Sequence, residues 1–196
     1  MNVNRLLSQA ISEGDGISLL VPVADLDAAR AAARDGAEGI VVSDPIEGLR
    51  DVTSLPVLCL TEGGPAAARV GADACVLRVD SVGGDWLRLR DLRAEAAELG
   101  LEPVLAVEDD EELEVALEHV DPEIILLSPP PPEDEHEPLE RVLDLLPDVP
   151  AGKLAIAEVT VRTREHVVAL ERAGVDAVIV KQGDVAQLVG GPPPEV

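Results

Sequence analysis

The sequence predicts an α/β fold, a small (β/α)8 TIM barrel formed by a chain of 196 residues. Three observations lead to this prediction: the strands are apolar on consecutive residues, helical patterns alternate with them, and the strand–helix units number eight. Runs without apolar–polar alternation are typical of parallel strands that are covered on both faces. Eight such units are the number that closes this barrel.

Four segments share one pattern and reveal a repeating unit. In each of them a helix ends, a small turn follows and an aliphatic strand begins: ARDGAEGIVVS, ARVGADACVLRV, LEHVDPEIILLS and ERAGVDAVIVK. A glycine at the end of the helix supplies the left-handed conformation that closes a helix. The recurrence of this junction indicates a series of similar strand–helix units.

The predicted elements follow one another along the whole chain. The strands are runs rich in Val, Leu, Ile and Ala at 17–23, 39–43, 56–60, 74–79, 103–107, 123–128, 154–159 and 177–181. The helical patterns cover 26–35, 46–52, 64–70, 85–99, 109–120, 138–146, 163–173 and 184–189. The helix at 109–120 begins with acidic residues, which the helix dipole favours in the first turn. An open, doubly wound sheet is the alternative architecture.

We expect a single domain over residues 1–190. A short N-terminal extension (1–16) precedes the barrel, and residues 191–196 form a flexible tail. The segment SPPPPEDEHEP, residues 128–138, is a proline run followed by acids, which favours an extended loop. Because it follows the sixth strand, we expect this loop to overhang the C-terminal mouth of the barrel, where the chemistry of such barrels takes place.

The charge excludes several kinds of partner. Thirty-nine acidic residues against fifteen basic ones leave a formal charge of −24. Such a surface repels phosphate backbones and anionic lipids, so we expect no nucleic-acid or membrane partner. It also fits a protein from a salty cytoplasm. The sequence shows no signal peptide and no apolar run near the roughly 20 residues of a membrane span, so we expect a cytoplasmic protein.

The hydrophobic residues, 46% of the chain, predict an aliphatic core, because there is no Phe, no Tyr and a single Trp86. Cys59 and Cys75 lie in apolar runs, which favours two buried thiols over a disulfide or a metal site. No cofactor is predicted.

From residue 54 onward the chain resembles the indole-3-glycerol phosphate synthase family, TIM-barrel enzymes of tryptophan biosynthesis of the ribulose-phosphate-binding type. SLPVLCL resembles the family's third strand, ARVGADACVLRV its third helix and fourth strand, and AAELGLEPVLAVEDDEELEVAL its fifth strand and the following helix. AEVTVRTREHVVALERAGVDAVIV, which resembles the seventh and eighth units, is the best match. Before residue 54 only AARAAARDGAEGIVVSDP and IEGLRDV carry a likeness.

The resemblance implies that most of the family's catalytic groups are replaced here. The family's general acid, a lysine at the end of strand three, falls on Leu60, and its partner glutamate on strand five falls on Ala106. Neither leucine nor alanine can donate or accept a proton. The strand-six asparagine falls on Ser128 or Pro129, and only Glu158, which matches the strand-seven glutamate, is retained. We therefore expect that the family's ring closure is not supported.

The family binds its substrate's phosphate with backbone amides after strands seven and eight. The glycines of these two turns fall on Thr160 and Lys181. Lys181 supplies a cation, and the QGDV turn presents amides at the start of a helix, a reasonable place for phosphate. The predicted ligand-binding residues are Thr160, Lys181, Gln182, Gly183, Ser128 and Asp80.

Glu158 and Lys181 end neighbouring strands and are the predicted catalytic pair. Three interpretations remain open: a structural ion pair, a ligand site, or catalysis in which Lys181 forms a Schiff base or transfers protons beside Glu158. Other polar residues also end strands, among them Arg78. A cation ringed by carboxylates is a further interpretation, with the candidate ligands Asp44, Asp80, Glu108 and Glu158.

Three functions remain open on the sequence. The first is a divergent carbon–carbon lyase or isomerase that acts on a small phosphorylated or carboxylated molecule. The second is a non-catalytic module that binds a protein partner through residues 128–138. The third is retained synthase activity. The ligand and the oligomeric state are left open.

Overall fold

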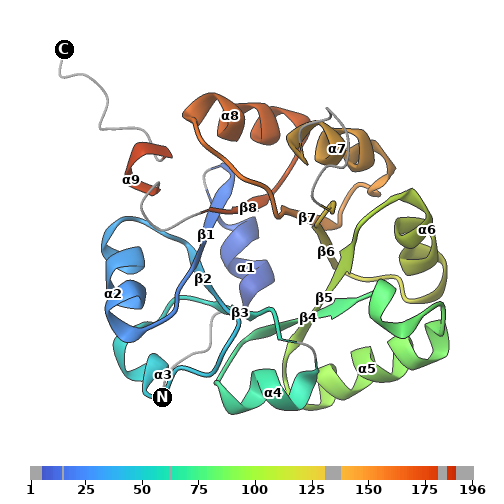
Figure 1. Ribbon diagram of the computed structural model, residues 1–196, viewed down its shortest axis with the longest axis horizontal. Coiled ribbons are helices and arrows are strands. Elements are labelled where there is room, and N and C mark those ends of the chain that lie inside the picture. The colour runs from blue at the N-terminus through green and yellow to red at the C-terminus, as the bar shows by residue number, and fades with distance from the viewer. Residues whose placement is uncertain (1–5, 15, 62, 131–137, 181–184, 189–196) are drawn as a thin grey trace.

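The computed structural model is a closed barrel of eight parallel strands in chain order (Figure 1). It describes residues 6–14, 16–61, 63–130, 138–180 and 185–188. The strands are β1 Ser18–Pro22, β2 Gly39–Val42, β3 Val57–Cys59, β4 Ala74–Arg78, β5 Glu102–Val107, β6 Ile124–Leu127, β7 Leu154–Ala157 and β8 Ala177–Ile179. The pairing of β1 with β8 closes the sheet, which confirms the barrel and excludes the open sheet.

Helices α2 to α8 form a ring around the strands, and α1 is seen within this ring (Figure 1). The described helices are α1 Leu7–Ser12, α2 Leu26–Arg34, α3 Leu49–Val52, α4 Gly64–Arg69, α5 Trp86–Glu98, α6 Asp110–His119, α7 Pro138–Leu145, α8 Arg164–Ala173 and α9 Val185–Leu188. Two 3-10 turns, η1 Asp80–Val82 and η2 Leu146–Asp148, complete the described elements. The predicted helices are confirmed within a few residues at each end. None of the described helices is long and apolar enough to cross a membrane.

Helix α1 lies within the segment that we predicted as an N-terminal extension, and it packs against the N-terminal end of the barrel. Leu7 and Ile11 are at most 4% exposed and join the cluster that fills the barrel interior. The Ser8 backbone N–H donates to the Glu102 carboxylate at the start of β5, at 3.2 Å. The helix therefore closes that end of the barrel.

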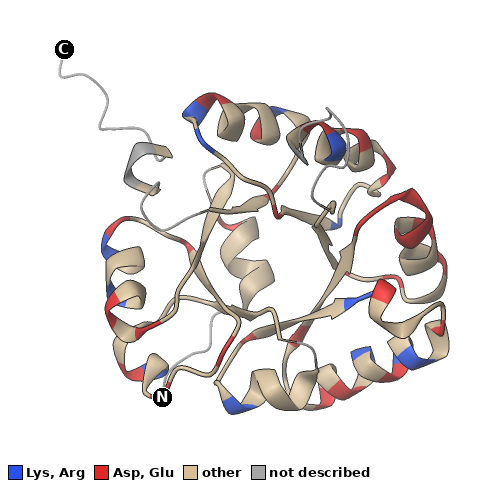
Figure 2. Cartoon of the chain, viewed as in Figure 1, with Lys and Arg blue, Asp and Glu red and all other residues tan. Residues whose placement is uncertain are grey.

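Successive residues of each strand alternate between two apolar environments. One set, which includes Val76, Leu126 and Ile156, fills the barrel interior. The other set packs beneath the helices. This double burial explains why the strands are apolar on consecutive residues. Figure 2 shows most Asp and Glu on the outer helices and loops, so the acidic composition leaves the core aliphatic.

The two cysteines are free, buried and opposite each other on β3 and β4, as predicted for buried thiols. Burial, followed by the neighbouring Cys59 and by Glu95, raises the pKa of Cys75 to about 11. Cys75 therefore stays protonated near neutral pH and is a poor nucleophile.

The four repeated junctions precede the even-numbered strands, and each carries an acidic residue just before its strand. In three of them the carboxylate accepts a hydrogen bond from a backbone N–H of the preceding strand. The donor–acceptor pairs are Leu19–Glu38 at 3.2 Å, Val57–Asp73 at 2.8 Å and Ala155–Asp176 at 2.8 Å. In the fourth, the strand register places Pro103 opposite Glu123, and proline has no N–H to donate.

Candidate functional site

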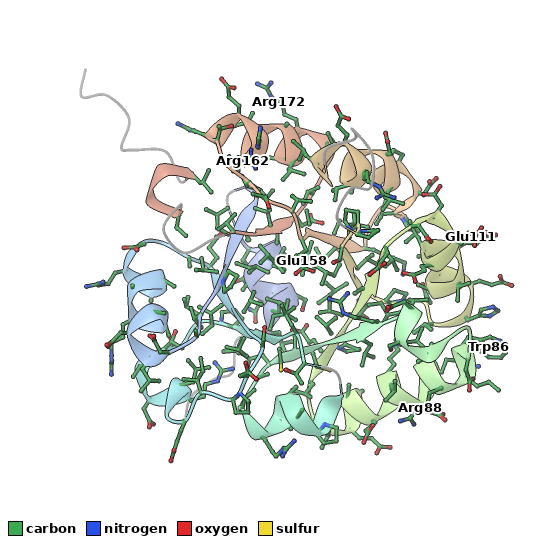
Figure 3. The ribbon with its side chains drawn as sticks, viewed as in Figure 1. Trp86, Arg88, Glu111, Glu158, Arg162 and Arg172 are labelled. Atoms are coloured by element: carbon green, nitrogen blue, oxygen red, sulfur yellow. The ribbon has the colours of Figure 1, made fainter. Side chains whose placement is uncertain are left out.

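Four polar side chains stand at the carboxyl ends of four consecutive strands. Arg78 is the last residue of β4, and Glu108, Ser128 and Glu158 follow β5, β6 and β7. In each case the residue two positions earlier is part of the barrel interior: Val76, Ala106, Leu126 and Ile156, in the same order. Because side chains two apart in a strand share a face, the four polar groups continue the interior column at the barrel mouth. Figure 3 shows Glu158 near the centre of the ring of helices.

Arg78 lies between two carboxylates at this mouth. Its Nη1 is 3.9 Å from Glu108 Oε1, and its Nη2 is 4.0 Å from Glu158 Oε2. The Ser128 hydroxyl donates to Glu158 Oε2 at 2.7 Å. The three charged side chains are 28–34% exposed. Ion pairs this long and this solvated contribute no more than about 1 kcal/mol each, so the charges remain available to a ligand.

A second carboxylate supports the β5 end of the site. The backbone N–H of Glu108 donates to Glu112 Oε2 at 2.7 Å. Partial burial raises the pKa of Glu112, and the negative charges of Asp109, Asp80 and Glu108 add to this, while the hydrogen bond from Glu108 acts in the opposite direction. This side of the mouth is therefore a region of negative potential that Arg78 partly balances.

The predicted ligand-binding residues differ in where they lie. Ser128 contacts Glu158 directly. Asp80, the first residue of η1, and Thr160, after β7, are exposed, and no hydrogen bond or ion pair links either of them to Glu158. Three other predicted residues lie outside the described part of the chain: Lys181, Gln182 and Gly183. The pairing of Glu158 with Lys181 therefore stays a prediction.

The two positions matched to the family's acid and base carry apolar side chains that pack into the barrel. Ala106 is 2% exposed and belongs to the interior cluster, and Leu60 packs against that cluster. Among the described residues, no group of three or more His, Cys, Asp and Glu side chains is arranged to hold a metal ion. The four proposed carboxylate ligands therefore do not form a ring.

Sequence reasoning noted Arg78 as a polar strand end but did not single it out. A signal was present, because Arg78 continues the alternation of Ala74 and Val76, both interior residues of β4. Its contacts with Glu108 and Glu158 depend on packing across four strands, which strand periodicity alone does not give.

Comparison with known proteins identifies relatives of this chain. The model of the family described as indole-3-glycerol phosphate synthase matches residues 65–185. The indole-3-glycerol phosphate synthase of Chlorobium limicola (strain DSM 245 / NBRC 103803 / 6330) is 32% identical over 114 residues, 58% of this chain and 43% of that protein. The enzyme of the same name from Variovorax paradoxus (strain S110) is 35% identical over 111 residues, 57% of this chain and 41% of that protein. The matches thus span less than half of these relatives.

Solved structures with low sequence identity share the fold. The N-acetylmannosamine-6-phosphate 2-epimerase from Clostridium perfringens has a TM-score of 0.69 at 16% identity, over 87% of this chain and 88% of that one. A mutant tryptophan synthase α-subunit from Pyrococcus furiosus has a TM-score of 0.63 at 16% identity, over 87% and 88% of the two chains. At these identities the likeness concerns the barrel architecture alone. The match over residues 65–185, more than half of the chain, shows that this chain belongs to the indole-3-glycerol phosphate synthase family.

Proposed function

We propose that this barrel binds a small phosphorylated or carboxylated metabolite at its C-terminal mouth and is not an active indole-3-glycerol phosphate synthase. The observation that carries the proposal is the partly exposed Arg78 guanidinium between the carboxylates of Glu108 and Glu158. A guanidinium binds carboxylate and phosphate groups through paired hydrogen bonds. An anionic ligand can therefore take over Arg78 from its two long ion pairs.

The apolar residues at the positions of the family's acid and base support the loss of synthase activity. Proton transfer requires a donor and an acceptor within hydrogen-bond reach of the reacting atoms. Leu60 and Ala106 offer neither, and both pack against the barrel interior. The chain also has a single aromatic residue, Trp86, which lies on α5 outside the strands, so an aromatic substrate finds no ring at the mouth to stack on.

The remaining groups suit proton transfer on a small molecule. Glu158 is oriented by the Ser128 hydroxyl, and Glu108 lies on the other side of Arg78. Two carboxylates around a bound anion can remove and return a proton next to a carbonyl group, which is chemistry of a lyase or an isomerase. Lys181, predicted at the end of the neighbouring strand, would add a second cation or an amine nucleophile.

A binding experiment with a matched control tests this proposal. Thermal unfolding of the native protein, Glu158→Gln and Glu111→Gln would be followed with inorganic phosphate, ribose 5-phosphate and malate. Figure 3 places Glu111 on α6 at the outer edge of the ring, so the control removes the same charge far from the mouth. A ligand at about a hundred times its dissociation constant should add roughly 2.7 kcal/mol to the stability.

We expect at least one ligand to stabilise the native protein and Glu111→Gln equally, and Glu158→Gln differently. If none of the ligands stabilises the native protein, the mouth does not bind such anions. Deletion of residues 131–137 in a partner-capture assay would then examine the alternative, a non-catalytic assembly module. Formation of indole-3-glycerol phosphate by the purified protein would contradict the loss of synthase activity.

A further inference from the structure

Three surface cavities can be compared by the charges that line them. The first, between α5 and the starts of β5 and β6, is lined by two arginines and two glutamates. The second, along α6, is lined by four acidic residues and no basic one. The third, of about 450 Å³, is lined by two arginines and one aspartate. In a chain with a formal charge of −24, this third cavity has a local excess of positive charge.

The third cavity adjoins the candidate site. It lies between the end of β4, the turn η1 and the first turns of α5, and the basic residues that line it are Arg78 and Arg88. Arg78 is also the guanidinium that lies within 4.0 Å of Glu158. Arg78 therefore lines the cavity and also contacts the carboxylates of the mouth. Its volume lies in the range of about 300–1,000 Å³ that is usual for small-molecule sites.

The other polar groups of the cavity are already engaged. The Asp85 carboxylate caps α5 by accepting from the Arg88 backbone N–H at 3.1 Å. The Ser81 hydroxyl donates to the Arg78 carbonyl at 2.8 Å. The Arg88 guanidinium, in contrast, forms no ion pair or hydrogen bond with any described residue. The groups that remain for a ligand are therefore the Arg88 guanidinium and the Arg78 guanidinium, which is held by two long ion pairs.

We propose that this cavity is the anion subsite of the candidate site and holds the phosphate or carboxylate group of the ligand between Arg78 and Arg88. The inference rests on the proposed function and adds where the charged end of the ligand is bound. With that end held at β4, the rest of a small molecule extends across the mouth toward Glu158 and Ser128. Arg78 then links anion binding to the carboxylates, because the bound anion competes with Glu108 and Glu158 for the same guanidinium.

This position differs from the one that the family resemblance implies, after strands seven and eight. There the described residues Thr160 and Arg162 are both exposed, and Thr160 stands where the family has a glycine. Figure 3 shows Arg162 and Arg88 on opposite sides of the ring of helices. The two arginines therefore distinguish the two positions.

The test compares Arg88→Ala with Arg162→Ala, which removes the same charge on the opposite side. Calorimetric titration with inorganic phosphate, ribose 5-phosphate and ribose would measure binding to each protein. We expect Arg88→Ala to weaken binding of both phosphates at least tenfold, which is about 1.4 kcal/mol. Arg162→Ala should bind within twofold of the native protein. Both variants should unfold at the native temperature without ligand, because each removes an exposed side chain.

The outcomes separate the two proposals. If Arg162→Ala or Lys181→Ala loses phosphate binding and Arg88→Ala keeps it, the anion subsite lies after strands seven and eight, and the proposed function stands. If phosphate binds equally to the native protein, Arg88→Ala, Arg162→Ala and Lys181→Ala, the proposal of a subsite at β4 is wrong. If neither inorganic phosphate nor ribose 5-phosphate binds the native protein, both proposals are wrong for phosphorylated ligands.

Discussion

The two ends of the barrel use the same residue types in opposite ways. At the N-terminal end α1 closes the interior, and carboxylates such as Asp73, which is 3% exposed, bind backbone N–H groups. At the C-terminal end the charged side chains of Arg78, Glu108 and Glu158 are about a third exposed, and the ion pairs between them are 3.9–4.0 Å long. In a protein with so many acidic residues, a structural carboxylate is distinguished from a candidate functional one by the groups that it contacts.

The largest expected effect is the loss of stability when Asp73, at the N-terminal end of the barrel, is replaced. Its carboxylate accepts hydrogen bonds from the Arg50 guanidinium and from the Val57 N–H. Asp73→Ala leaves the Val57 N–H without its acceptor and removes the carboxylate partner of Arg50, which keeps only its hydrogen bonds to two backbone carbonyls. We therefore expect urea unfolding to show a loss of about 3–5 kcal/mol. Asp27→Ala breaks the exposed pair with Arg30 and should cost less than about 1 kcal/mol. Equal losses in the two variants would remove the distinction between buried and exposed carboxylates.

Two adjacent leucines test whether α1 is a structural closure of the barrel. Leu7 is fully buried, whereas its neighbour Leu6 is 46% exposed. Leu7→Ala should lower the free energy of unfolding by about 2–5 kcal/mol, because it leaves a cavity beneath the barrel. Leu6→Ala should change it by no more than about 0.5 kcal/mol. A small effect of Leu7→Ala would show that the barrel is stable without this helix.

The smallest expected effect is a pH dependence at the C-terminal end. Burial raises the pKa of Glu112 above its ordinary value of 4.5, so the neutral form is favoured more in the folded protein than in the unfolded chain. The stability that this provides is complete below pH 4.5 and is lost as the pH rises through the raised pKa. Glu112→Gln cannot ionise and should therefore be slightly more stable than the native protein at pH 7.5.

Thermal unfolding at pH 7.5 and pH 5, both above the isoelectric point of about 4.2, measures this difference. The advantage of Glu112→Gln should narrow at pH 5. A variant that is less stable than the native protein at pH 7.5 would mean that the hydrogen bond from Glu108 outweighs the burial of the carboxylate. The pKa of Glu112 would then be lowered instead of raised.

The sequence predicted the barrel well because its signal is local. Consecutive aliphatic residues located all eight strands within one or two residues of their ends. Helix α1 was not predicted, because its six residues LSQAIS are too short to show a helical period. In the candidate site, Glu158 and Ser128 were predicted because they fall on polar positions of the family that the sequence resembles. The role of Arg78 depends on contacts that reach across strands, and periodicity does not encode them.

The carboxylates before the even-numbered strands also determine where the chain can be opened. Each of the three bonds joins an odd strand to the even strand that follows it: β1 to β2, β3 to β4 and β7 to β8. A circular permutant with new termini between β2 and β3 keeps both partners of every bond within one contiguous stretch. New termini between β3 and β4 would instead send Val57 and Asp73 to opposite ends of the chain. In this respect three pairs of strands act as units, and β5 and β6 are the pair without such a bond.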